Sequence, residues 1–277
     1  MEYFQKNIPD WKNEELVNEL KTFKKIYDSR PIKENTGGML FPHMFAVYFI
    51  LKKIKPSFII ESGVYKGQST WLIENTLPES KILSIDIDLS KRQYFSKKAE
   101  YSNLDFKHHD FSNIPSDTLV FFDDHVNHYE RVMQAKFFNI KSIIFEDNYT
   151  KNSSKADFYT IKNSYQNWGF LHPKSFSKSF GHLKTLLIFT LEIIKKIFLN
   201  NYYINTFKII SRLKDYKKNE NDFKNIEKNI DVYYEFPPIF KHNKNSTPPI
   251  IKNKEIEFKL SKKELLSYNF ITYIKLK

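Results

Sequence analysis

The chain has 277 residues, with 44 Lys and Arg against 32 Asp and Glu, a formal net charge of +12 and no cysteine. This length provides one large domain, or a domain with an appendage, and the 41% hydrophobic content is that of a globular protein rather than a disordered one. The lack of cysteine excludes disulfides, thiolate-bound metal and a thiol nucleophile, so any metal must bind to oxygen or imidazole ligands.

The positive charge is concentrated late in the chain. Residues 1–173 hold 23 Lys and Arg against 22 Asp and Glu, whereas residues 174–230 hold 12 against 5 and residues 231–277 hold 9 against 5. The field that would attract an anionic partner therefore belongs to the later segments. The polar, acidic start and the lack of any uncharged apolar run of about 18 residues predict a soluble, cytoplasmic protein.

Two helices are expected first, an amphipathic one at 11–30 and a more buried one at 39–54. Strands and helices then alternate, which predicts right-handed βαβ units and a parallel sheet whose ligands bind beyond the carboxyl ends of the strands. The expected strands are 54–63, 80–88, 103–110, 117–124 and 141–148, and the helices between them are 69–77, 90–101 (with Ser90 as N-cap) and 127–139.

The loop after the first strand carries the most informative motif, Glu61-Ser-Gly63-Val-Tyr65-Lys-Gly67-Gln-Ser69. Glycines let a backbone approach a ligand closely, and the helix that follows offers unpaired N–H groups. The spacing fits neither the dinucleotide-binding G-x-G-x-x-G pattern nor the phosphate-binding G-x-x-x-x-G-K-[ST] pattern.

This E-x-G-x-Y-x-G-x-S run resembles the first motif of class I S-adenosylmethionine-dependent methyltransferases, and most of all that of catechol O-methyltransferase and its metal-dependent relatives. The resemblance implies S-adenosyl-L-methionine as cofactor. In that family the loop wraps the amino-acid end of the cofactor, a position that would fall to Glu61, Gly63, Tyr65, Gly67 and Ser69.

The same resemblance places further cofactor contacts after the next two strands. Asp86 matches the acid that binds both ribose hydroxyls, a task that suits a carboxylate because its two oxygens accept two donors. Asp110 and the adjacent Phe111 match the region of the adenine contacts.

Acidic side chains follow the fourth and fifth strands, in Phe-Asp-Asp-His and Glu-Asp-Asn-Tyr. By position, Asp124, Asp147 and Asn148 match the magnesium ligands of the catechol-type enzymes. Three oxygen ligands at strand ends suit Mg²⁺ or another divalent cation. The alternative is that acids at strand ends merely cap the helices that follow.

One position departs from the catechol pattern. Asn127 stands where those enzymes carry a basic lysine, and it cannot accept the hydroxyl proton. His125 and His128 flank it and have suitable pKa values for a general base. The run HYERVMQA before a strand ending in paired acids is also similar to macrocin O-methyltransferase and cephalosporin-hydroxylase-like proteins, which implies a sugar or small metabolite as acceptor.

The class I fold requires two more strands, an antiparallel pair at the sheet edge, which residues 231–240 and 269–277 fit. The expected fold is thus an α/β, Rossmann-like, mostly parallel sheet with an antiparallel last strand and a helical insertion. The expected parts are a helical cap at 1–53, a cofactor-binding core at 54–173, a basic helical insertion at 174–230 and the last two strands at 231–277.

The insertion includes an apolar helical stripe at 183–199 among lysines. It could form a lid over an acidic acceptor, lie on the inner face of an anionic membrane, or pack on the core. No nucleic-acid-binding module is visible, so nucleic acid is not the expected partner.

The sequence therefore predicts a metal-assisted O-methyltransferase that acts on a hydroxyl of a sugar, glycan or small metabolite. The alternative is a non-catalytic Rossmann-like scaffold or a membrane-peripheral binding protein.

Overall fold

The computed structural model describes residues 5–149, 161, 224–241, 247–252, 260–261, 264, 267 and 270–277. The chain forms two compact units. The first combines Met1–Val126, Glu130–Asn148 and Asn229–Lys277, and the second combines Asn127–Tyr129 with Tyr149–Lys228. The predicted helical stripe at 183–199, and most of the basic insertion at 174–230, lie outside the described residues.

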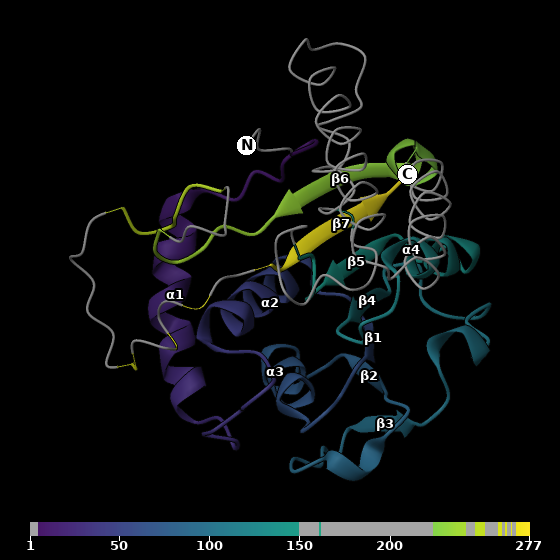
Figure 1. The fold of residues 1–277 in the computed structure, drawn as a ribbon, viewed down its shortest axis with the longest axis horizontal. Helices are drawn as coiled ribbons and strands as arrows, with labels where there is room; N and C mark the ends of the chain where they lie inside the picture. Colours follow the sequence, from purple (N-terminus) through teal and green to yellow (C-terminus); the bar gives the residue numbers. More distant parts are fainter. Residues whose placement is uncertain are drawn as a thin grey trace, which may run out of the picture. The chain divides into compact units, whose positions relative to one another are not determined.

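The first unit is built on a seven-stranded sheet with the order β3-β2-β1-β4-β5-β7-β6 (Figure 1). β7 runs antiparallel to both of its neighbours, and the other pairs are parallel. This confirms the predicted fold class, a mostly parallel Rossmann-like α/β sheet with an antiparallel last strand. The strands are β1 Phe58–Ser62, β2 Lys81–Ile85, β3 Ala99–Ser102, β4 Leu119–Phe122, β5 Ser142–Phe145, β6 Ile230–Glu235 and β7 Thr272–Leu276.

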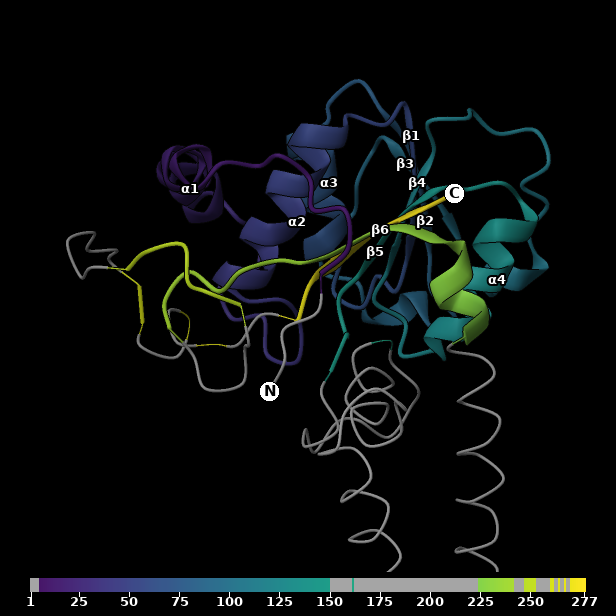
Figure 2. The ribbon, with the colours of Figure 1, turned by 90° about the horizontal axis from the view of Figure 1, so that it is seen from above.

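Helices cover both faces of this sheet, with α1, α2 and α3 on one face and α4 on the other (Figure 2). The expected helices at 11–30, 39–54, 69–77 and 127–139 are confirmed. Their bounds are α1 Asn13–Asp28, α2 Phe41–Ile54, α3 Gln68–Thr76 and α4 His128–Phe137. α2 is buried without interruption from Phe41 to Leu51, because it lies against both α1 and α3. A helix that is apolar all round is stable only in such a position.

The segment before α1 covers the edge strand of the sheet. Lys6 and Tyr233 of β6 exchange two backbone hydrogen bonds, each 3.0 Å long. Backbone groups of β6 that would otherwise face solvent are thereby paired, which removes a site for unwanted strand addition.

The prediction of a helix at 90–101 is wrong. A short 3₁₀ helix at Leu89–Lys91 is followed by irregular chain and then by β3. The Oγ of Ser96 accepts hydrogen bonds from the backbone N–H groups of Lys98 and Ala99, both 3.0 Å. A serine side chain that bonds nearby N–H groups in this way competes with helical hydrogen bonding.

The predicted position of the third strand is also wrong. It was expected at 103–110 but lies at Ala99–Ser102, and a 3₁₀ helix occupies Phe106–His108. Asp105 begins that turn by accepting a hydrogen bond from the backbone N–H of Lys107. β3 is a short edge strand without a fully buried residue, so its sequence lacks the apolar run that marks the other strands.

None of the helices in the described part of the chain is long and apolar enough to cross a membrane.

Candidate active site

A cavity of about 470 Å³ opens at the carboxyl edge of the sheet, where ligands bind in folds of this kind. Its walls come from the loops after β1, β2 and β4, from Asp105, from Arg131 on α4 and from the segment after α1. The residues that line it include Asn35, Gly63, Tyr65, Gln68, Ser69, Asp86, Asp105, Asp123, Asp124, His125 and Arg131.

The glycines of the first loop are required by the fold itself. Gly63 has φ +103°, and a Cβ there would lie 2.0 Å from the backbone oxygen of Asp123. Gly67 has φ +87°, and its Cβ would lie 2.7 Å from the backbone oxygen of Tyr94. The loop therefore packs so tightly against its neighbours that no side chain fits at either position. Gly63 also lines the cavity, whereas Gly67 is not among the lining residues described.

Asp86 holds the same loop in place from the end of β2. Its Oδ2 accepts hydrogen bonds from the backbone N–H groups of Val64 (2.9 Å) and Tyr65 (2.8 Å), and its Oδ1 accepts one from Asp88 (2.9 Å). Each carboxylate oxygen has two lone pairs, so Oδ2 is fully used by its two donors, whereas Oδ1 retains capacity for one further donor. Asp86 lines the cavity, as the sequence predicted for a cofactor-binding acid.

Glu61 does not lie where the motif suggested. It is fully buried at the end of β1 and is not among the residues that line the cavity. Its Oε2 accepts hydrogen bonds from Thr70 on α3 (2.6 Å) and from Ser84 on β2 (2.5 Å). Burial raises the pKa of this carboxyl group above its usual value. Within the described structure Glu61 thus joins β1, β2 and α3. Ser69, next to Thr70 on α3, lines the cavity.

Asp110 and Phe111 are not brought to the cavity either. Asp110 is exposed and accepts a hydrogen bond from the backbone N–H of Ser112. Phe111 is buried against Phe106 and Phe138. Because β3 ends earlier than expected, Asp105 takes the position at the cavity wall that the sequence assigned to Asp110.

Three side chains gather where β4 and β5 end. Potential ligand atoms of Asp123, His125 and Asp147 all lie within 4.8 Å of one another. The Nδ1 of His125 lies 2.6 Å from Oδ2 of Asp147, and the imidazole is largely exposed while the carboxylate is buried. Burial, together with the charges of Glu146 and Asp147, raises the pKa of Asp123 well above its usual range. A carboxylate so crowded by like charges is stabilised by a cation or a proton.

Asp124 has partners outside this cluster. It forms an ion pair with Arg131 (2.8 Å) and accepts a hydrogen bond from Ser62 (2.6 Å). The Nδ2 of Asn148 donates to Tyr233 (2.9 Å) and to Thr272 (2.7 Å), on β6 and β7, and its Oδ1 is the atom that could bind a cation. Of the two predicted aspartate ligands, Asp147 belongs to the cluster and Asp124 does not.

A second buried pair lies beside the cluster. Glu146 lies 2.7 Å from Nδ1 of His43 on α2. Burial and the neighbouring Asp147 raise the pKa of Glu146 to about 7, and His43 opposes that rise. The sequence showed Glu146 only as a neighbour of the site, and nothing in it linked His43 to the strand ends.

The two histidines predicted as bases are separated by the structure. His125 lines the cavity and has a backbone φ of +56°, uncommon for a residue other than glycine. His128 belongs to the second unit, where its Nδ1 accepts a hydrogen bond from the backbone N–H of Ile161 (3.4 Å). The geometry therefore supports His125 as the histidine of this site.

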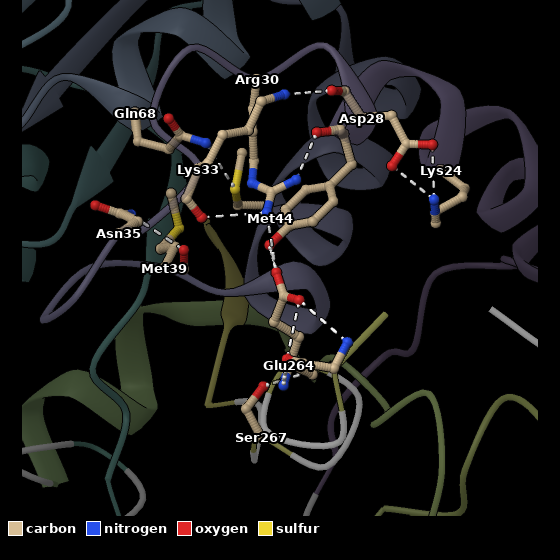
Figure 3. A network of polar contacts seen from close by, with 12 residues as sticks. Lys24, Asp28, Arg30, Lys33, Asn35, Met39, Met44, Gln68, Glu264 and Ser267 are labelled. Atoms are coloured by element: carbon tan, nitrogen blue, oxygen red, sulfur yellow. Dashed lines mark hydrogen bonds and ion pairs between the residues drawn. The ribbon is translucent and has the colours of Figure 1, made fainter. Parts of the chain in front are cut away.

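The segment after α1 forms a further wall and is fixed by a network of polar contacts (Figure 3). Glu264 accepts hydrogen bonds from the hydroxyl of Tyr27 (2.6 Å) and from Arg30 (3.1 Å). Farther along, Nδ2 of Asn35 donates to the backbone oxygen of Met39 (3.1 Å). Glu264, near the C-terminus, is thus joined to the end of α1, just before the chain enters the cavity wall.

The sequence matches no known family model, and no curated protein matches it. Solved structures show weak similarity. A structure of CmcI without ligand is 16% identical, with a TM-score of 0.37 over 66% of this chain and 78% of that chain. CmcI with Mg and SAM is 21% identical, with a TM-score of 0.35 over 57% and 68%. An O-methyltransferase assigned by similarity from Klebsiella pneumoniae is 14% identical, with a TM-score of 0.34 over 66% and 79%. The function proposed for this chain therefore depends on its own strand order and cavity.

Proposed function

We propose that this protein is an S-adenosylmethionine-dependent O-methyltransferase. The observation that carries the proposal is the cavity at the carboxyl edge of β1 and β2, in which the tight loop around Gly63 is held by Asp86. While it keeps the loop closed, the carboxylate can still accept a hydrogen bond from a ribose hydroxyl through Oδ1. The cavity volume of about 470 Å³ falls within the range for small-molecule and cofactor sites.

The cavity offers matching groups for the amino-acid end of the cofactor. Asn35 and Gln68 line it, and their buried Oδ1 and Oε1 atoms accept no hydrogen bond from the described residues. Buried acceptors without a donor are costly, and an ammonium group would supply the missing donors. We assign this end of the cofactor to Asn35, Gln68, Ser69, Gly63 and Tyr65.

The base end of the cofactor is assigned to the opposite wall. Ile87 is 78% exposed although it lines the cavity, and an exposed isoleucine there offers an apolar surface to a flat ring. Asp105 lies in the same cavity and can accept from an exocyclic amine. Asp105 replaces Asp110 in this role, and Phe111 has none.

The cluster of Asp123, His125 and Asp147 fits a divalent cation. Two carboxylates and one imidazole are a donor set for Mn²⁺, Fe²⁺ or Zn²⁺ as well as for Mg²⁺. A bound cation would lower the pKa of an acceptor hydroxyl. Asp123 and Asp147 would hold the cation and His125 would contribute its imidazole, so Asp123 takes the place of the predicted Asp124; Oδ1 of the predicted Asn148 is a further oxygen ligand for the same cation.

The chemistry required of the protein is limited. An acceptor oxygen attacks the methyl carbon of the sulfonium, an O–C bond forms, the C–S bond breaks and the hydroxyl proton leaves. The protein must align these atoms and receive the proton. In a cation-free variant of this mechanism, His125 would receive the proton while Asp147, 2.6 Å away, orients its ring.

The acceptor is proposed to be a hydroxyl of a sugar, glycan or small metabolite. This part depends on the sequence resemblance alone, because the described cavity accounts for the cofactor. Contact between the basic insertion and an anionic membrane stays a prediction, since residues 181–223 lie outside the described part of the chain.

Isothermal titration with S-adenosylhomocysteine tests the proposal. The protein should bind the ligand saturably, and Asp86→Ala should weaken binding strongly. Asp117→Ala is the matched control, because Asp117 accepts hydrogen bonds from Ser57 at the opposite edge of the sheet and does not line the cavity. Absence of binding by the intact protein would favour the alternative, a non-catalytic scaffold.

A further inference from the structure

Arg131 is among the largest fully buried side chains of the described chain, with 1% of its surface exposed. It projects from α4 to the wall of the cavity. The run HYERVMQA contains Arg131, but nothing in the sequence indicated what its side chain contacts. A buried guanidinium is costly unless its donors and its charge are matched.

The guanidinium of Arg131 donates four hydrogen bonds and makes one further ion-pair contact. Nε donates to Oδ2 of Asp124 (2.9 Å), and Nη2 lies 2.8 Å from the same oxygen. Nη1 and Nη2 each donate to one oxygen of Asp105, both at 2.9 Å, and Nη1 also donates to Gln134 (2.9 Å). The guanidinium therefore joins the end of β4 to the wall that carries Asp105.

Aromatic rings enclose this arrangement. The guanidinium carbon lies 5.6 Å from the ring centroid of Phe106 and 5.5 Å from that of Phe122. The rings limit the access of water, and electrostatic interactions are stronger where water is excluded. Arg131 is thereby held in one position rather than exchanging among partners.

Asp124 has little capacity left for a further ligand. Besides Arg131, its Oδ2 accepts a hydrogen bond from the Oγ of Ser62 (2.6 Å), and its Oδ1 accepts one from the backbone N–H of Val126 (3.2 Å). Asp123, the preceding residue, belongs to the cluster with His125 and Asp147 instead.

We infer that Arg131 is a positioning residue that gives the two adjacent aspartates different roles. It fixes Asp124 as a structural anion between β1, β4 and Asp105, and leaves Asp123 as the carboxylate that binds a divalent cation with Asp147. This inference rests on the cation site of the proposed function. It differs from the assignment that the sequence resemblance implied, in which Asp124 is the ligand.

Titration with Mn²⁺, followed by electron paramagnetic resonance of the free ion, tests the inference without any measurement of activity. Asp123→Asn should abolish Mn²⁺ binding, whereas Asp124→Asn should change the Kd by less than about threefold, the equivalent of about 0.7 kcal/mol. Asp117→Asn, at the far edge of the sheet, is the control and should bind as the unaltered protein does. Loss of Mn²⁺ binding in Asp124→Asn to the same degree as in Asp123→Asn would overturn the inference.

Substitution of Arg131 should increase the affinity for Mn²⁺, an increase that a purely structural role of Arg131 would not produce. Arg131→Gln removes a positive charge beside the cluster and releases Asp124, so Mn²⁺ should bind more tightly while the melting temperature falls. The double variant Asp124→Asn with Arg131→Gln removes both partners and should recover much of the melting temperature. If Arg131→Gln and the double variant both bind Mn²⁺ more weakly than the unaltered protein, the inference fails.

Failure of the inference is distinguishable from failure of the proposed function. If the intact protein binds S-adenosylhomocysteine but no Mn²⁺, the division of roles between Asp123 and Asp124 is refuted while the cofactor site stands. If it binds Mn²⁺ as described but no S-adenosylhomocysteine, the methyltransferase proposal fails and the cation site stands.

Discussion

Gly63→Ala should destabilise the fold far more than the addition of one methyl group would suggest. A left-handed backbone costs a residue other than glycine about 1–2 kcal/mol, and Gly63 has φ +103°. The new Cβ would also lie 2.0 Å from the Asp123 oxygen, whereas real Cβ atoms almost never approach within 3.0 Å, so the ends of β1 and β4 must separate by about 1 Å. The backbone hydrogen bond from Asp123 to Ser62, 2.7 Å long, lies at that point. Overpacking of this kind adds about 1–3 kcal/mol.

Gly37→Ala is the matched control, because Gly37 has φ +86° but its Cβ would meet no atom closer than 3.6 Å. It should show the backbone cost alone, about 1–2 kcal/mol. Equilibrium urea unfolding of the two variants therefore measures the clash by difference. If Gly63→Ala loses no more free energy of unfolding than Gly37→Ala, within about 0.5 kcal/mol, the tight contact with β4 is refuted. The large cost also means that substitutions of Gly63 cannot separate cofactor binding from folding.

Three further predictions concern the surroundings of the cavity. Thr70→Val removes a donor from the buried Glu61 and should lower the free energy of unfolding by about 1–3 kcal/mol in urea titrations; an unchanged value would refute the link beneath the loop. The hydrogen bonds of Arg131 lower the pKa of Asp105 from 3.8 to about 2, so the stability that this group contributes is fully present above about pH 4 and is lost as the pH falls through about 2. Melting temperatures between pH 5 and 2 should therefore fall less steeply in Asp105→Asn, and an identical slope would contradict this. His125→Ala should weaken Mn²⁺ binding in the resonance titration and leave S-adenosylhomocysteine binding in calorimetry unchanged; unaltered Mn²⁺ binding would remove His125 from the site.

The sheet was predictable because burial leaves a direct pattern in the sequence. β1, β4 and β5 are short apolar runs, and each ends in a polar residue or turn, so their number and order along the chain could be read. β3 could not, because a half-exposed edge strand such as Ala99–Ser102 carries no such run. The helix expected at 90–101 failed for a related reason. Its prediction depended on the alternation of strands and helices and on Ser90 as an N-cap, whereas the Oγ of Ser96 and the backbone oxygen of Lys66 accept hydrogen bonds from the N–H groups that a helix would need.

The site was predictable to the level of strand ends but not to single residues. The sequence located Asp86 and Asp147 because each follows a buried strand directly. It could not distinguish Asp123 from Asp124, because the difference is made by Arg131 seven residues beyond Asp124, on a helix whose orientation the motif does not contain. The motif assigns Glu61 to the cofactor, because the sequence does not show that Thr70 and Ser84 donate hydrogen bonds to it.

The most direct test of the methyltransferase proposal is a crystal structure of the protein grown with S-adenosylhomocysteine at saturating concentration. We expect the ligand in the cavity between the loops after β1 and β2, with a ribose hydroxyl within hydrogen-bond distance of Oδ1 of Asp86 and the amino-acid end toward Asn35 and Gln68. A cavity without the ligand under these conditions, or a ligand bound elsewhere with Asp86 contacting only the backbone of the loop, would contradict the proposal.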